Sequence, residues 1–191
     1  MATTPQDALT ELKQKTREIS ILQTCGALLD WDEHTYMPSK GSEFRAEQLS
    51  YIAGLTHGRM VDPRIGELIE TIKGSDMMDG GQSDAAVVVR EVGRVYDRAT
   101  KMPQKLVEEI SKTASLAQNA WQQARAKADY ALFKPWLAKM IDLKKQEAEA
   151  VGYTDDPYNA LLDDFEPGAT VAETEKTLTE LRKNLVVLLD K

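Results

Sequence analysis

The spacing of the apolar residues constrains the fold of this chain more than any other feature. Along almost all of the 191 residues, apolar side chains recur every three or four positions, as they do in helices that bury one face. No convincing run alternates between apolar and polar residues, which is the pattern of a half-buried strand. We therefore predict an all-α fold of about seven helices that forms a single region over residues 1–191.

Local signals place the ends of these helices. Thr4, Pro5 and Asp7 are typical of a helix start, and we predict a long first helix that ends near Trp31. The same signals predict further helices from the break at 38–41 to about Gly58, from Asp62 to Gly74, from Ser83, from Pro103, and from about Asp129 to Gly152.

The last predicted helix begins at the capping box of Thr170 and Glu173, and its apolar stripe continues to the end of the given sequence at Lys191. A helix with such a stripe and no terminator suggests a fragment boundary, with a natural C-terminus as the alternative.

Composition excludes several classes of partner. A net charge of −7 and a pI near 5.0 oppose binding to nucleic acid, which needs clustered Lys and Arg. Apolar runs of about five residues cannot cross a bilayer, which takes roughly 20, so we predict no membrane partner. The N-terminus lacks the pattern of a secretory signal. Cys25 is the only cysteine, so no internal disulfide forms, and a cytoplasmic location is the simplest expectation.

Three residues that could carry chemistry are explained by helix packing instead. Cys25 lies among leucines in a helical stretch and is expected to be a small buried side chain. Trp121 and Trp136 lie in apolar helical faces and are expected in the core rather than in a ligand platform.

The polar segment from Asp30 to Tyr36 leaves three interpretations open. Asp30 and His34 are four apart and share a helical face, as in a simple surface pair. The segment could instead line a substrate cleft or an interface, or supply oxygens and a nitrogen to a metal. A helical zinc peptidase needs HExxH, and neither His34 nor His57 begins or ends that pattern.

Four segments, in their order along the chain, resemble the carboxypeptidase Taq family. The segment that begins at Leu28 reads LLDWDEHTYMP and is similar to the family signature LLxWDxxTxMP. Three further segments follow in the family order: RAEQL from Arg45, DYALFKPWL from Asp129, and PYNALLDDFEPG from Pro157.

The resemblance implies the start of a larger helical, zincin-like metallopeptidase. Members of the family are usually homodimeric zinc exopeptidases that remove single C-terminal amino acids from peptides with broad specificity. Their HExxH and other catalytic residues lie beyond the matching part, so we assign no catalytic residue and no metal ligand here. Zinc is expected in the full-length parent, bound outside this chain, and this chain alone is expected to be inactive.

The helices of this chain would then form one wall of the substrate cleft and face the missing catalytic region. The candidates for that wall, or for the joint between the two parts, are Trp31, Asp32, Tyr36 and Met37. The alternative is a stand-alone, non-catalytic helical interaction module.

Overall fold

A computed structural model describes residues 4–189, and every regular element in that range is helical. The all-α prediction is confirmed. The α-helices are α1 (Pro5–Thr35), α2 (Ser42–Met60), α3 (Pro63–Lys73), α4 (Asp84–Lys101), α5 (Gln104–Lys127), α6 (Lys134–Val151), α7 (Pro157–Leu162) and α8 (Val171–Leu189). Three 3-10 helices join them: η1 (Ser39–Gly41), η2 (Asp76–Gly81) and η3 (Tyr130–Leu132). Within residues 4–189, no helix is both long enough and apolar enough to span a bilayer.

The helix starts are capped as predicted. The backbone N–H of Asp7 donates to Thr4 Oγ1 at 3.2 Å, which satisfies one of the unpaired N–H groups of the first turn. Asp62 and Ser83 cap α3 and α4 in the same way. Since these contacts involve neighbours in the chain, they follow from the sequence.

The second half of the chain differs from the prediction in two places. The stretch after Asp129 begins with η3, and α6 starts only at Lys134, with Pro135 in its first turn. The helix α7 was not predicted at all, because six residues are too short to show an apolar period. Asp156 caps it by accepting from the N–H of Tyr158 at 2.8 Å.

The chain divides into two compact units, residues 4–143 and 144–189, and α6 runs from one into the other. The single region expected over residues 1–191 stays a prediction. In the first unit the main core lies where the start of α1 meets α3 and α4, and its largest fully buried side chains are Leu12, Ile65, Leu68, Ile72 and Val89.

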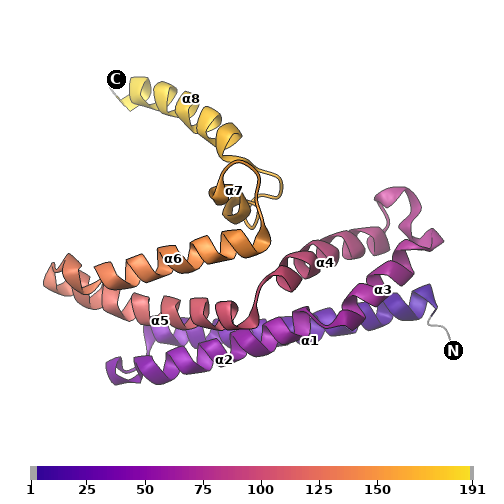
Figure 1. Ribbon diagram of the computed structural model, residues 1–191, viewed down its shortest axis with the longest axis horizontal. Coiled ribbons are helices and arrows are strands. Elements are labelled where there is room, and N and C mark those ends of the chain that lie inside the picture. The colour runs from indigo at the N-terminus through magenta and orange to yellow at the C-terminus, as the bar shows by residue number, and fades with distance from the viewer. Residues whose placement is uncertain (1–3, 190–191) are drawn as a thin grey trace. The chain divides into compact units, whose positions relative to one another are not determined.

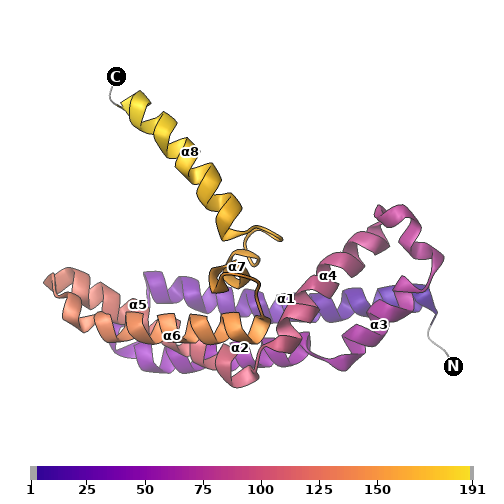
Figure 2. The same cartoon turned by 45° about the horizontal axis from the view of Figure 1, so that its top comes forward.

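Helix α2 lies along both α1 and α5 (Figures 1 and 2). Small residues allow the close approach of α2 and α5. The Oγ of Ser50 donates to the carbonyl oxygen of Glu108 at 3.0 Å, and a Cβ added at Gly54 would lie 2.3 Å from Glu108 Oε1. The side of α5 that carries Thr113 and Ala117 is buried.

In the second unit, Asn159 ties the loop after α6 to the start of α8. Its side chain donates to the carbonyl of Thr154 at 2.9 Å and accepts from the N–H of Val171 at 2.8 Å. Thr170 caps α8 by accepting from the N–H of Glu173 at 3.3 Å, so the predicted cap is confirmed. None of the described residues of α8 is buried.

Charged pairs join α1 to α3 at the surface of the first unit. Arg64 holds both carboxylate oxygens of Glu11, at 2.9 and 2.8 Å, and Lys15 Nζ lies 2.7 Å from Asp62 Oδ2. The hydrogen bond from Lys15, followed by that from the N–H of Arg64, lowers the pKa of Asp62 below its ordinary value. The side chain of Arg64 likewise lowers the pKa of Glu11.

This geometry predicts a loss of stability in acid. A carboxylate whose pKa is lowered by folding stabilises the folded state above its unfolded pKa, and this contribution is lost as the pH falls through the lower, folded pKa. We expect the urea midpoint to fall between about pH 5 and about pH 3, and to fall less steeply in Asp62→Asn. Asparagine is a good helix cap, so this variant removes the charge and keeps the cap. If the urea midpoints of the wild-type chain and of Asp62→Asn fall equally steeply with pH, the carboxylate of Asp62 does not contribute to the loss of stability in acid.

Candidate functional site

The candidate site is the C-terminal end of α1. The helix runs past its predicted end near Trp31 because the N–H groups of Tyr36 and Met37 both donate to the carbonyl of Asp32, at 3.0 and 2.9 Å. These bonds satisfy a carbonyl that the helix itself leaves unpaired. The side chains of the last two turns therefore leave the helix from a defined backbone.

Asp32 is held by an arginine from α2. Arg45 Nη2 lies 2.6 Å from Asp32 Oδ2, and Arg45 Nη1 donates to the carbonyl of Leu29. The side chain of Arg45 is only 12% exposed. A mostly buried arginine bonded to a carboxylate and a carbonyl is strongly oriented, so the pair joins α1 to α2.

Glu33 makes a second connection, from α1 to α5. The Oγ of the buried Ser115 donates to Glu33 Oε1 at 2.5 Å. The two neighbouring acids of α1 therefore hold two different helices. Sequence reasoning missed the roles of Glu33, Arg45 and Ser115. Arg45 did lie in a segment that resembles the family, but nothing near Ser115 marked it.

Trp31 and Tyr36 form an aromatic pair at the surface. Their ring centroids are 5.6 Å apart with an interplanar angle of 63°, an edge-to-face contact. The two residues are 54% and 76% exposed. Asp32 and Glu33 fix the end of α1 through their bonds to the neighbouring helices. The aromatic pair therefore faces solvent from a helix end that is held in place.

The structure therefore brings together only part of the predicted set. Trp31 and Tyr36 touch each other, whereas Asp32 is bonded to Arg45. Met37 is half-buried against the η1 turn, where a Cβ added at Gly41 would lie 3.3 Å from Met37 Cγ.

Further apolar residues are exposed on the two helices that carry the site. They are Ile21, Leu28 and Trp31 on α1, and Phe44, Tyr51 and Leu55 on α2. Cys25 is also exposed, so the prediction that it is buried is wrong. Of the leucines around it, Leu28 is exposed, whereas Leu22 and Leu29 are half-buried.

The described residues do not fit a zinc ion. His34 Nδ1 lies 2.7 Å from the carbonyl oxygen of Asp30 and 3.8 Å from its carboxylate, and both side chains are exposed, as in a surface pair. His57 is buried in α2. Among the described side chains, no three His, Cys, Asp or Glu residues come close enough to hold a metal. We derive no metal chemistry from this part of the chain.

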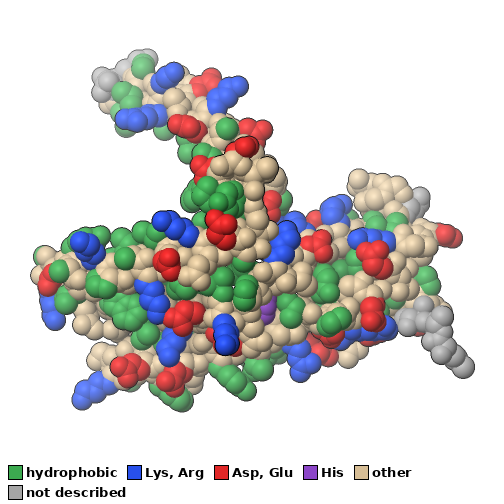
Figure 3. Space-filling model, in the orientation of Figure 1, with side chains coloured by type: hydrophobic (Ala, Val, Ile, Leu, Met, Phe, Trp, Pro, Cys, Tyr) green, Lys and Arg blue, Asp and Glu red, His purple; other side chains and the backbone are tan. Residues whose placement is uncertain are grey.

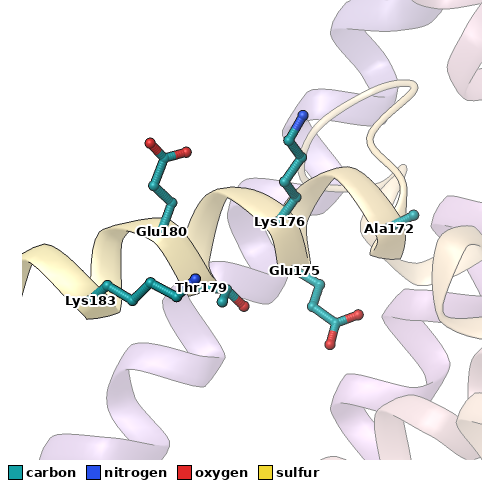
Figure 4. A pocket seen from close by; sticks show the side chains of 6 residues that line it. All are labelled: Ala172, Glu175, Lys176, Thr179, Glu180 and Lys183. Atoms are coloured by element: carbon teal, nitrogen blue, oxygen red, sulfur yellow. The ribbon is translucent and has the colours of Figure 1, made fainter.

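The concavity in Figure 4 is lined by a single helix, α8. Its lining residues are Ala172, Glu175, Lys176, Thr179, Glu180 and Lys183. One helix cannot enclose a ligand, and the mixture of acids and lysines is typical of a solvated face.

A different hollow lies at the end of α5 and is lined in part by Trp121. Trp121 is 43% exposed, so its assignment to the core is wrong, whereas Trp136 is half-buried. Apolar side chains reach the surface along α5 and the start of α6 (Figure 3).

Comparison with known proteins gives consistent results. The model of the carboxypeptidase Taq (M32) metallopeptidase family matches residues 11–191. Thermostable carboxypeptidase 1 of Thermus thermophilus is 40% identical over 98% of this chain and 39% of its own length. The crystal structure of BsuCP has a TM-score of 0.85 at 31% identity over 92% of this chain and 35% of its own. The carboxypeptidase of Pyrococcus furiosus has a TM-score of 0.76 at 33% identity over 96% and 36%. The chain thus spans 34% to 39% of the length of the curated relatives.

Proposed function

Because the chain belongs to the carboxypeptidase Taq (M32) metallopeptidase family, we propose that it is the substrate-enclosing helical part of a zinc-dependent carboxypeptidase. In this proposal the whole protein removes single C-terminal amino acids from peptides with broad specificity. The observation that carries the proposal is the exposed Trp31 and Tyr36 pair on a helix end that is held from two sides.

The end of α1 combines a helix end held by two neighbouring helices with exposed side chains. A wall of a binding cleft needs side chains that stay in place without the ligand, because ordering them during binding costs free energy. Arg45 and Ser115 supply that order by holding Asp32 and Glu33. Trp31, Tyr36 and Met37 would then contact the peptide or the joint to the catalytic region, whereas Asp32 acts as a positioning residue.

A zinc ion in the catalytic region would polarise the peptide carbonyl and activate a water molecule. Since the side chains that the structure describes offer it no ligand cluster, the role proposed for this chain is to bound the cleft and exclude water. Exclusion of water strengthens electrostatic interactions inside a site.

We further propose that the whole protein is a cytoplasmic homodimer. The single cysteine agrees with a reducing, cytoplasmic location, and the resemblance to the family supports the homodimer.

A chimera tests the proposed function. Residues 1–191 replace the matching part of thermostable carboxypeptidase 1 of Thermus thermophilus, to which they are 40% identical. We expect the chimera to release the C-terminal residue of a blocked dipeptide, to lose this activity with a chelator and to regain it with zinc. The 191-residue chain, assayed alone with zinc, should release nothing.

Two results would overturn the proposal. A chimera that folds and binds zinc but does not hydrolyse the dipeptide would favour the alternative of a non-catalytic interaction module. Chelator-sensitive hydrolysis by the 191-residue chain alone would show that the catalytic residues lie within it.

A further inference from the structure

The hollow at the end of α5 has the composition of a small-molecule site. It measures about 460 Å³ and is lined by Trp121, Ala124, Arg125, Asp129, Tyr130 and Phe133, together with Ala128. The volume falls within the range usual for ligand pockets. All of these residues belong to the first unit and come from α5 and the segment around η3. None of them lies in the wall proposed at the end of α1.

A left-handed residue creates the hollow. Ala128 has a φ of 51°, and α5 closes with hydrogen bonds from the N–H of Ala128 to Arg125 and from the N–H of Asp129 to Ala124. Asp129 then caps η3 by accepting from the N–H of Ala131 at 3.0 Å. The reversal brings Tyr130 and Phe133 to the hollow that Trp121 lines. Glycine is the usual residue at this position, because the Cβ of an L-residue there comes too close to the following carbonyl oxygen.

Two aromatic side chains of the hollow face solvent. Trp121 is 43% and Tyr130 is 61% exposed. Tryptophan, tyrosine and arginine are the residue types that contribute most to binding energy at interfaces, and all three occur here. Large aromatic surfaces at a concave site provide contact area for an apolar group at a small loss of side-chain entropy.

The segment that forms the hollow, residues 121–134, carries three basic residues and one acid. The guanidinium of Arg125 lies 5.9 Å from the centroid of the Trp121 ring. None of the ion pairs described within residues 4–189 gives Arg125 a carboxylate partner, so its N–H donors are available. Lys127 and Lys134 are exposed nearby in the chain, and the one acid among the lining residues, Asp129, uses an oxygen in its cap. In a chain of net charge −7, this local excess favours an anion.

We propose that this hollow binds a carboxylate that carries an aromatic or branched apolar group. The apolar group lies against Trp121, Tyr130 and Phe133, and the carboxylate accepts hydrogen bonds from Arg125, whose planar guanidinium matches a carboxylate in geometry. Two sources have this chemistry: a free N-acyl amino acid, and the C-terminal residue of a peptide. The site requires no hydrolysis, so the proposal is independent of the function proposed for the end of α1.

Titration of the 191-residue chain tests this site, with intrinsic fluorescence and calorimetry as readouts. The probes are N-acetylphenylalanine, its neutral amide, N-acetylglycine, and a blocked tripeptide that ends in phenylalanine. We expect saturable binding of N-acetylphenylalanine, and binding that is about tenfold or more weaker for the amide, since the hydrogen bonds to a charged group are lost. N-acetylglycine, which has no apolar group, should bind weakly as well. A tripeptide that binds more tightly than N-acetylphenylalanine identifies a peptide terminus as the ligand, and one that does not identifies a free amino-acid derivative.

Matched variants locate the site. Arg125→Gln should weaken binding of N-acetylphenylalanine by about tenfold, whereas Lys127→Gln, which removes a neighbouring charge outside the lining, should change it less than about twofold. Trp121→Ala should abolish the saturable binding of N-acetylphenylalanine. Circular dichroism checks that this variant retains its helices. Equal binding of the acid and its amide, unchanged binding by Arg125→Gln, or no saturable binding of N-acetylphenylalanine would each overturn the proposal.

Discussion

Leu12→Ala should lower the free energy of unfolding by about 2–5 kcal/mol, because the substitution leaves a cavity in a core that cannot fully collapse. Leu12 is completely buried and belongs to the core cluster that includes Ile65, Leu68 and Ile72 of α3. Leucine and alanine are both good helix formers, so the expected effect comes from packing and not from helix propensity. Urea unfolding of the 191-residue chain, with the midpoint and the slope determined together, measures it.

The same substitution on the same helix supplies the control. Leu28 is 63% exposed in α1, and Leu28→Ala should change the free energy of unfolding by no more than about 0.5 kcal/mol. Similar losses at the two positions would mean that the second half of α1 is covered in the isolated chain, for example by self-association, which light scattering would detect.

Trp31→Ala should lower kcat/KM of the chimera by about tenfold to a hundredfold, the range expected when a large aromatic contact with the ligand is removed. Zinc content should not change, because Trp31 belongs to no metal-ligand cluster among the described residues. The melting temperature should change little, since Trp31 is 54% exposed and its main aromatic contact is with Tyr36. Steady-state kinetics on a blocked dipeptide, together with metal analysis, provides the measurement.

Tyr51→Ala is the matched control for this prediction. Tyr51 is an exposed aromatic residue of α2 that lies outside the pair at the end of α1. Its replacement should leave kcat/KM within about twofold of the parent chimera, as expected for a surface change that removes neither ring of the aromatic pair. If Trp31→Ala leaves the kinetics unchanged and lowers the melting temperature instead, Trp31 is a packing residue and not part of the cleft wall.

The helical class, most helix starts and the family could be predicted from the sequence. The caps at Thr4, Asp62 and Ser83 depend on a side chain and a backbone group two or three residues apart, so their chemistry is visible in the chain itself. The period of the apolar residues identifies which face of a helix has to be covered. Helix α7 is too short to show this period, and the period did not distinguish η3 from α6.

The partners of the candidate site could not be predicted, because they come from distant parts of the chain. Asp32 and Glu33 are neighbours in the sequence, yet one is held by Arg45 from α2 and the other by Ser115 from α5. Asp32 stays a predicted residue of the cleft wall, and the structure adds that its carboxylate is bonded to an arginine. The aromatic contact between Trp31 and Tyr36 likewise depends on how α1 ends.

The sequence by itself determined the helices, their caps and the family of the protein, because these depend on residue types at short and regular spacing. Only the tertiary structure decided which apolar residues are covered: Leu12 is buried, whereas Cys25 and Trp121 at similar helical positions are exposed. The reason is physical. The apolar period of a helix shows that one of its faces is hydrophobic. Burial of that face requires a second surface, and whether one is present depends on the packing of the whole molecule.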